Sequence, residues 1–201
     1  MITVLMPTYN VSQYVGQAIR SILDQTYDDF EFLIIDDCSN DDTVERIKSF
    51  RDRRIRLIET DKTQGISDML NIGLNEASNE LIARMDGDDI SFPTRFEKQL
   101  AYLKANLQAN VISSDYAMFD DNKILYTVKA AERHADIRKR LALHSEIMHP
   151  AAMFKKRAIT DNGGYRNIKI EDYELWLRIK DKVVFGNVPE VLLLKRYRRD
   201  S

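Results

Sequence analysis

Short aliphatic segments alternate with helical patterns through the first half of the chain. Residues 2–6 form an apolar run that ends at Pro7, which predicts a buried strand. Apolar residues then recur at intervals of three and four, as on the buried face of a helix. Because crossovers of this length join parallel strands, the repeated alternation predicts a parallel sheet covered by helices on both faces. The expected strands are 2–6, 30–35, 55–59 and 81–85, and the expected helices are 15–23, 44–50 and 67–77.

The second half of the chain is less regular. A helix with Phe96, Leu100 and Leu103 on one face is followed by two strand patterns, 111–119 and 124–128, that predict a hairpin around the turn 120–123. This hairpin departs from the simple alternation of strands and helices. We expect one α/β domain over residues 1–201. The remaining expected elements are helices at 136–143 and 171–180 and strands at 151–154, 183–186 and 191–197, with a break at Gly163-Gly164.

Acidic residues follow two of the predicted strands at the point where each strand ends. Asp36-Asp37 comes after the second strand and Asp86-Gly87-Asp88-Asp89 after the fourth, and Asp41 or Asp42 is placed to cap the helix between them. Ligands of parallel sheets bind at this carboxyl edge. Clustered carboxylates repel one another, and a hard divalent cation such as Mg²⁺ or Mn²⁺ relieves the repulsion. The alternative is ordinary solvated loops, which explain most isolated Asp-x-Asp sequences.

Composition and charge narrow the function further. The chain has 30 Lys and Arg against 32 Asp and Glu, a net charge of −2, which gives no electrostatic case for binding nucleic acid. The single cysteine, Cys38, excludes an internal disulfide, and one cysteine with three scattered histidines does not form a zinc site. Neither a P-loop nor a dinucleotide-binding glycine motif is present, so a bound diphosphate would be held by metal.

Several motifs, in order along the chain, resemble those of one enzyme family. They are Pro7-Thr8-Tyr9-Asn10, residues 35–41 around Asp37, Asn71, residues 83–91 with Pro93 and Arg95, and residues 171–178 around Asp172. The set is similar to the bacterial family 2 glycosyltransferases, which are inverting enzymes of the GT-A fold. The resemblance implies a Rossmann-like, mostly parallel central sheet flanked by helices, with a small antiparallel element in the second half. It also implies a donor half at about 1–110 and an acceptor half at about 111–201.

The resemblance assigns one group of residues to a nucleotide-sugar donor. Thr8 and Tyr9 would line the nucleobase pocket, and Asp37 would accept a hydrogen bond from the base, usually uracil in this family. Asp86 and Asp88 would hold the metal. Arg84 would pair with Asp88 or a phosphate, or form a structural ion pair. Cys38 departs from the small residue, such as glycine, that relatives carry there. The positions assigned to the donor are Pro7, Thr8, Tyr9, Asp37, Arg84, Asp86, Asp88 and Asp89.

The later acidic motif would supply the catalytic base. Inversion needs a carboxylate that takes the proton of the attacking acceptor hydroxyl, and Asp172 matches the family's base. Glu171 is its competitor, since neighbours on a helix point about 100° apart. Without the resemblance, an acidic first turn that complements the helix dipole is the better explanation of this pair.

Three other features have competing explanations. His149 would contact the acceptor or a phosphate, or be a hydrogen-bonded structural histidine. Trp176 would pack in the core more readily than stack on a sugar. The basic residues Lys195, Arg196, Arg198 and Arg199 would be a solvated terminal run, a grip on the donor diphosphate, or a contact with anionic lipids.

The predicted function is transfer of a sugar from a nucleotide-diphosphate donor, with UDP as the expected nucleotide, to a glycan or lipid-linked acceptor in bacterial surface polysaccharide synthesis. The alternatives are an inactive nucleotide-sugar-binding module and a sugar-nucleotide pyrophosphorylase, although Pro7-Thr8-Tyr9-Asn10 replaces the glycine- and arginine-rich loop of the latter. We expect a cytoplasmic protein, without signal peptide or spanning helix, that contacts the inner face of the membrane peripherally. Family members often run longer, so a minimal or C-terminally truncated member is expected.

Overall fold

The computed structural model describes residues 1–120 and 123–198. Two parts of the sequence predictions lie outside this range, namely Asp121-Asn122 in the hairpin turn and Arg199 in the basic run. Within the described residues no helix is both long and apolar enough to cross a membrane. The elements of the first half are β1 (Ile2–Thr8), α1 (Ser12–Leu23), β2 (Phe30–Asp36), α2 (Thr43–Lys48), β3 (Ile55–Glu59), α3 (Ile66–Glu76), β4 (Leu81–Arg84) and β5 (Ile90–Ser91). The others are α4 (Arg95–Ala105), β6 (Val111–Asp120), β7 (Lys123–Val128), α5 (His134–Arg140), the 3₁₀ helix η1 (His149–Ala151), β8 (Met153–Lys155), α6 (Lys156–Thr160), α7 (Glu171–Ile179) and β9 (Phe185–Arg196).

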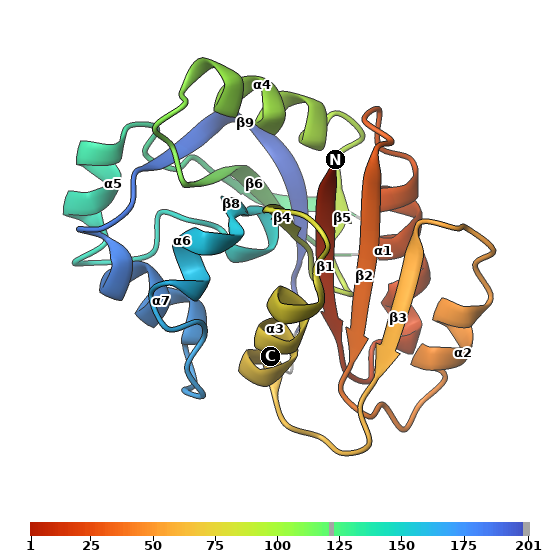
Figure 1. The fold of residues 1–201 in the computed structure, drawn as a ribbon. Helices are drawn as coiled ribbons and strands as arrows, with labels where there is room; N and C mark the ends of the chain where they lie inside the picture. The colour runs from red at the N-terminus through yellow and green to blue at the C-terminus, as the bar shows by residue number, and fades with distance from the viewer. Residues whose placement is uncertain (121–122, 199–201) are drawn as a thin grey trace.

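One curled sheet runs through the described residues, with the strand order β3-β2-β1-β4-β8-β6-β9-β5 and β7 paired to the edge of β6 (Figure 1). Strands β1 to β4 are parallel, as the alternating pattern predicts. The antiparallel part is larger than the predicted hairpin, because β8 is antiparallel to both β4 and β6, and β5 to β9. The α/β class and the mostly parallel sheet flanked by helices are confirmed.

Side chains of the central strands alternate between two hydrophobic layers. In β2, Phe32 and Ile34 pack with α1 on one face, while Leu33 and Ile35 pack with α3 and α7 on the other. Each fully buried side chain of this size stabilises the fold by roughly 1.5–3 kcal/mol. Figure 1 shows α1 and α3 on opposite sides of the strands β1 and β2. The central strands are apolar throughout because both faces are covered.

Two predicted strand boundaries are wrong. Strand β1 continues through Pro7 to Thr8, because its pairing with β4 ends at Leu5 and no partner there needs the missing N–H of Pro7. The last two predicted strands are one strand, β9. Its pairing with β6 is irregular between Val188 and Leu193. The expected break between two strands is therefore a bulge within one strand.

Candidate functional site

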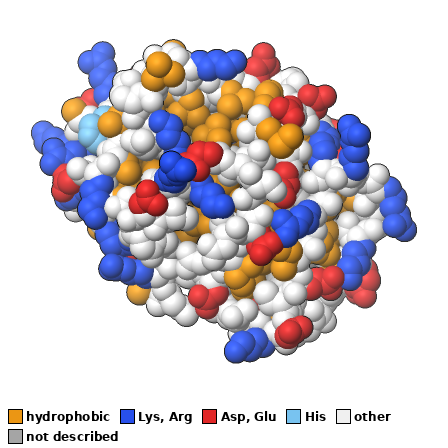
Figure 2. All heavy atoms as spheres, in the orientation of Figure 1, with side chains coloured by type: hydrophobic (Ala, Val, Ile, Leu, Met, Phe, Trp, Pro, Cys, Tyr) orange, Lys and Arg blue, Asp and Glu red, His pale blue; other side chains and the backbone are white. Residues whose placement is uncertain are grey.

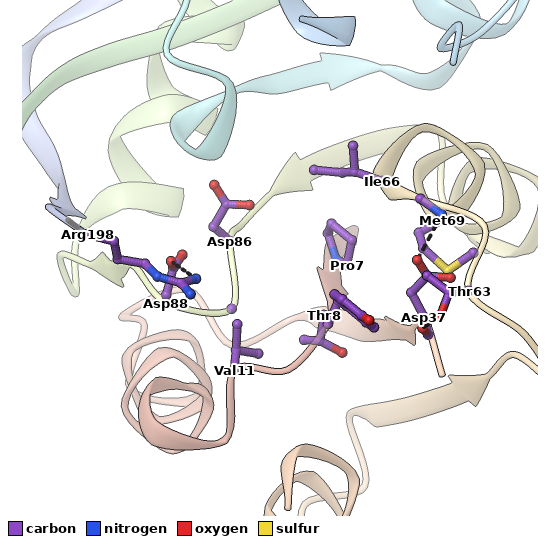
Figure 3. A pocket seen from close by; sticks show the side chains of 13 residues that line it. Pro7, Thr8, Val11, Asp37, Thr63, Ile66, Met69, Asp86, Asp88 and Arg198 are labelled. Carbon is purple, nitrogen blue, oxygen red and sulfur yellow. Dashed lines mark hydrogen bonds and ion pairs between the residues drawn. The ribbon is translucent and has the colours of Figure 1, made fainter. Parts of the chain in front are cut away.

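A cavity of about 410 Å³ opens at the carboxyl ends of β1, β2 and β4. Figure 3 shows Asp37 at one end, Asp86 and Asp88 at the other, and Pro7 and Thr8 between them. The cavity is therefore apolar in its centre and acidic at both ends. Residues of the predicted donor site that line it are Pro7, Thr8, Tyr9, Asp37, Asp86 and Asp88, joined by Val11, Thr63, Gly65, Ile66, Met69, Gly87 and Arg198.

Asp37 is held rigidly at one end of this cavity. Its two carboxylate oxygens accept hydrogen bonds of 2.8 Å from the backbone N–H groups of Gln64 and Gly65, which lead into α3. Gly65 has a φ of 95°, a conformation that glycine adopts without strain. A carboxylate has about four acceptor sites, so Asp37 keeps capacity for a further donor, or two, from a ligand.

Thr8 and Tyr9 serve the cavity differently. The hydroxyl of Thr8 is buried and donates to Oδ2 of Asp36 at 2.9 Å, so this residue presents its methyl group to the cavity. Asp36 also accepts two bonds from Ser39 and thereby joins the loops after β1 and β2. Tyr9 is 48% exposed at the rim, where its ring is available to a flat ligand. Cys38, expected beside the base, is exposed and is not part of the cavity lining.

The acidic end contains a cluster of three carboxylates. One oxygen each of Asp86, Asp88 and Asp89 lie within 4.8 Å of one another. Burial raises the pKa of Asp88 and, more strongly, that of Asp89, and Asp86 adds to both shifts. Oδ2 of Asp89 is buried and has no hydrogen-bond partner in the described part of the chain. An all-oxygen donor set with unrelieved negative charge fits a hard divalent cation.

The turn carrying these carboxylates approaches the first strand closely. A Cβ added to Gly87 would lie 3.1 Å from both Cγ2 of Thr8 and Cγ2 of Val11. A side chain at this position would require these methyl groups to move by a few tenths of an ångström, so glycine suits the close contact.

Arg84 lies behind the acidic cluster and does not line the cavity. It is 2% exposed, and its Nη1 is 2.5 Å from Oδ1 of Asp86, so the structural ion pair considered from the sequence is present, with Asp86 in place of Asp88. Burial acts to lower the pKa of Arg84, but Asp86 outweighs it and the pKa is raised. Arg95, also buried, donates to the carbonyl of Arg84 at 2.7 Å. Two buried arginines therefore support the strand end that carries the cluster.

The end of β9 closes over the acidic turn, a connection that the motifs did not reveal. The Arg196 backbone N–H donates to Oδ1 of Asp89, and its Nε donates to the carbonyl of Asp88, both at 2.8 Å. The guanidinium carbon is 4.5 Å from the ring centroids of Tyr14 and Phe119. Nη1 of Arg198 is 3.3 Å from Oδ2 of Asp88, as Figure 3 shows. Two residues of the predicted basic run, Arg196 and Arg198, therefore contact the acidic cluster.

The first turn of α7 places its two acidic residues differently. Glu171 is buried, and its pKa is raised first by burial and also by the neighbouring Asp172; Arg84 and Asp86 lie close enough for their charges to act on it. Asp172 is half-buried and lines a second cavity of about 290 Å³, which the hairpin β6–β7 and the loop before η1 enclose. The predicted base therefore lies outside the cavity of the predicted donor residues.

Two other candidates are buried side chains. His149 is buried, and its Nε2 is 2.9 Å from the hydroxyl of Tyr165; burial, with Arg84 and Lys195 nearby, lowers its pKa well below the usual value. Trp176 is fully buried and packs edge-on against His149 and Phe185, as expected for a core residue. Asn71 joins α3 to the backbone of Tyr165 through two hydrogen bonds.

Sequence reasoning missed residues that reach the cavity at the ends of β1, β2 and β4 from loops. Thr63, Ile66 and Met69 belong to the connection between β3 and α3 and its first helical turn. The only sequence signal was Gly65 before the helix.

On the visible face, Figure 2 shows Lys and Arg gathered along the edge that carries α5, while acidic and basic side chains are mixed elsewhere.

Solved structures share this fold. Staphylococcus aureus TarS (residues 1–349) in complex with UDP-GlcNAc superposes with a TM-score of 0.83 at 17% identity, over 98% of this chain and 59% of that one. The mannosyltransferase PcManGT from Pyrobaculum calidifontis, in complex with GDP-Man and Mn²⁺, gives 0.75 at 19% identity, over 98% and 57%. The present chain thus spans less than two thirds of either structure, and at these identities the likeness confirms the GT-A fold alone.

Sequence comparison adds the family. The O-antigen biosynthesis glycosyltransferase WbnJ of Escherichia coli is 33% identical over 210 residues, covering 100% of this chain and 81% of WbnJ. The E. coli UDP-Glc:alpha-D-GlcNAc-diphosphoundecaprenol beta-1,3-glucosyltransferase WfgD is 28% identical over 89% of this chain and 69% of its own length. The sequence model named Glycosyl transferase family 2 matches residues 3–163. From this match and the likeness to WbnJ, the chain belongs to glycosyl transferase family 2.

Proposed function

We propose that this chain is an inverting, metal-assisted glycosyltransferase that moves a sugar from a UDP-sugar to an acceptor hydroxyl. The observation that carries the proposal is one cavity with Asp37 at one end and the Asp86, Asp88 and Asp89 cluster at the other. A nucleotide-diphosphate needs a hydrogen-bond acceptor for its base and positive charge for its phosphates. The two ends of the cavity match these needs, the second through a bound cation.

In this proposal the donor lies along the cavity. The free acceptor capacity of Asp37 binds an N–H of uracil, and Tyr9 covers the base at the rim. Asp86 and Asp88 hold Mg²⁺ or Mn²⁺, with the buried Asp89 behind them. When bound, the cation neutralises the negative charge that develops on the leaving diphosphate. Arg198, paired with Asp88 in the structure, is placed to contact the same phosphates.

Asp172 is proposed as the general base. It would take the proton from an acceptor hydroxyl while that oxygen forms a bond to the anomeric carbon and the bond to the diphosphate breaks. UDP leaves with the electron pair. In an inverting reaction the acceptor hydroxyl attacks the anomeric carbon from the face opposite the diphosphate, so the base must lie on the far side of the transferred sugar from the diphosphate. Asp172 fits this requirement because it lines the second cavity. General-base catalysis of this kind contributes about 10²- to 10⁴-fold in rate.

We further propose a role in bacterial surface polysaccharide synthesis at the cytoplasmic face of the membrane. Support comes from relatives: WbnJ is named for O-antigen biosynthesis, and WfgD for an acceptor linked to diphosphoundecaprenol. An acceptor of that type is anchored in the membrane, so the enzyme would meet it peripherally.

Calorimetric titration tests the donor site. UDP is titrated into the protein with Mn²⁺, with Mg²⁺ and with chelator, and GDP and TDP are compared as competitors. We expect metal-dependent UDP binding that Asp88→Asn abolishes and Asp136→Asn, an exposed substitution on α5, leaves intact. Absence of nucleotide binding in every condition would refute the proposal, and binding without transfer or donor hydrolysis would favour an inactive binding module.

A further inference from the structure

The second cavity has a composition that the donor site does not explain. It is lined by the stem of the β6–β7 hairpin, the loop before η1, Asp172 from α7 and Lys195 from β9. At about 290 Å³ it is at the lower limit of small-ligand sites, the size for one sugar unit more than for an oligosaccharide. It also lies next to the proposed base, where an acceptor hydroxyl must be.

Lys195 is the first unusual feature of this cavity. It is half-buried, yet its ammonium group forms no hydrogen bond or ion pair with any residue in the described ranges 1–120 and 123–198. Its charge acts on His149 in the cavity wall and on Asp89 in the acidic cluster. A half-buried ammonium group loses part of its hydration, and here no ion pair with a carboxylate compensates for that loss. We therefore expect an anionic group of a ligand to bind it.

Lys129, at the end of the hairpin, is the second cationic group. It is exposed at the cavity and likewise has no ion-pair partner among the residues that the structure describes. The one buried carboxylate in the lining, Glu146, is already engaged: it accepts from the Ala131 N–H at 2.6 Å and pairs with Arg140, and Nδ1 of His144 lies 3.4 Å from its Oε1. Glu146 therefore fixes the loop, and among the described residues neither lysine forms an ion pair with it or with Asp172, the other carboxylate of the lining.

These observations point to the charge of the acceptor. We propose that the cavity beside Asp172 binds an acceptor sugar that carries a phosphate group, with Lys195 and Lys129 on the phosphate oxygens and a sugar hydroxyl on Asp172. A phosphate offers three oxygens to two ammonium groups that come from separate segments, one on β9 and one just after β7, whereas a carboxylate offers two. The inference rests on the proposed function, because it assigns the second substrate of the same reaction.

The phosphate takes no part in bond making. One acceptor hydroxyl loses its proton to Asp172 and bonds to the donor sugar, while the phosphate remains attached to the acceptor and holds it in place. Lys195 and Lys129 are thus specificity-determining residues. Because charged hydrogen bonds dominate such recognition, removal of either ammonium group should weaken binding of a phosphorylated acceptor by roughly 10- to 100-fold.

The test is an NMR titration of isotope-labelled protein saturated with UDP and Mg²⁺, so that the donor cavity is filled. The probes are glucose 1-phosphate and N-acetylglucosamine 1-phosphate, each against its uncharged methyl glycoside, with the methyl glycoside of glucuronic acid as the carboxylate arm. We expect the phosphates to shift the amide signals of Ala130, Ser145 and Met148 and to bind at least tenfold more tightly than the glycosides. Lys195→Met and Lys129→Met should remove this preference, and Lys123→Met on β7 should keep it.

Three results would overturn the inference: equal affinity for phosphates and glycosides, tighter binding of the uronate, or a phosphate preference that survives in a variant carrying both Lys195→Met and Lys129→Met. Lys195→Arg, which keeps the charge, should retain the preference and guards against a folding defect in Lys195→Met. UDP affinity is measured on every variant. If UDP binds and the preference is absent, only this inference fails. If UDP does not bind, the proposed function fails, and the cavity is titrated without nucleotide.

Discussion

The backbone N–H of Arg196 donates a 2.8 Å hydrogen bond to Oδ1 of Asp89, a residue 107 positions earlier in the chain. This bond and the one from Nε of Arg196 to the carbonyl of Asp88 attach β9 to the acidic turn. The geometry of the acidic cluster therefore depends on a strand that the sequence places far from it.

Substitution of Arg196 by lysine should loosen that turn. A lysine cannot donate to the Asp88 carbonyl and to Oε1 of Gln17 with the fixed fork of a guanidinium. We expect the free energy of unfolding to fall by about 1–3 kcal/mol and Mn²⁺-dependent UDP affinity to fall with it. Urea denaturation and calorimetry measure the two effects. Arg46→Lys, exposed on α2, is the matched control. Unchanged UDP affinity in Arg196→Lys would separate the β9 contact from the metal site.

The two acidic residues of α7 should differ in kinetics. Asp172→Asn should lower kcat by about 10²- to 10⁴-fold without changing UDP affinity, because it removes the proposed base. Glu171→Gln should have a smaller effect, since Glu171 is buried on the side of Arg84 and Asp86. Steady-state rates with a responsive acceptor measure both. If Glu171→Gln is the more damaged enzyme, the base is Glu171.

Cys38 should be replaceable by glycine with a gain in stability. Its φ is 59°, in the left-handed region that costs an L-residue roughly 1–2 kcal/mol. Glycine avoids this strain but loses about 0.5–1 kcal/mol of unfolded-state entropy. The net expectation for Cys38→Gly is a gain of up to about 1.5 kcal/mol. The β-branched Cys38→Val should be less stable than the parent protein. Denaturant midpoints of the three proteins decide, and a less stable glycine variant would contradict the strain argument.

Asp41 should stabilise the protein in a pH-dependent way. It accepts from the N–H groups of Ser12 and Thr43. From the position before the N-cap residue Asp42 it therefore satisfies the first N–H of α2, as a capping side chain does, and ties α2 to the start of α1. Burial acts to raise the pKa of Asp41, but the bonds from Thr43 and Ser12 outweigh it and lower the pKa to about 2. A pKa below the unfolded value means that the contribution is complete above about pH 4 and is lost as the pH falls through about 2.

The corresponding measurement is a comparison of Asp41→Ala with the parent protein by urea denaturation across this range. Near neutral pH the variant should be less stable by about 1 kcal/mol, the usual value of a cap. Towards pH 2 the difference should shrink. Asp42→Ala is the control, because Asp42 makes no side-chain capping bond. A difference that stays constant down to pH 2 would rule out the charge of Asp41 as its cause.

The sequence alone identifies those residues of the site whose positions follow from the local pattern of strands and helices. Asp37, Asp86 and Asp88 were identifiable because each follows a strand, and strand ends of a parallel sheet meet at one edge. Cavity residues such as Thr63 come from loops whose path depends on tertiary contacts. The bonds from Gln64 and Gly65 to Asp37 involve backbone groups, which carry no residue-type signal. Lys195 and Arg196 were recognisable only as a basic run, because their separate environments depend on strand pairing.

The directions in which Lys195 and Arg196 point depend on whether the bulge in β9 adds an odd or an even number of residues. From Ser114 to Tyr116, β6 advances two residues while its partner β9 advances five, from Val188 to Leu193. The three extra residues are an odd number, so side chains of β9 beyond the bulge face the side opposite to the one that regular pairing would give them. Insertion or deletion of one residue in this bulge would exchange the directions of Lys195 and Arg196. The arginine would then point to the cavity beside Asp172 and the lysine to the acidic turn. The number of residues in the bulge therefore decides which basic side chain reaches which cavity.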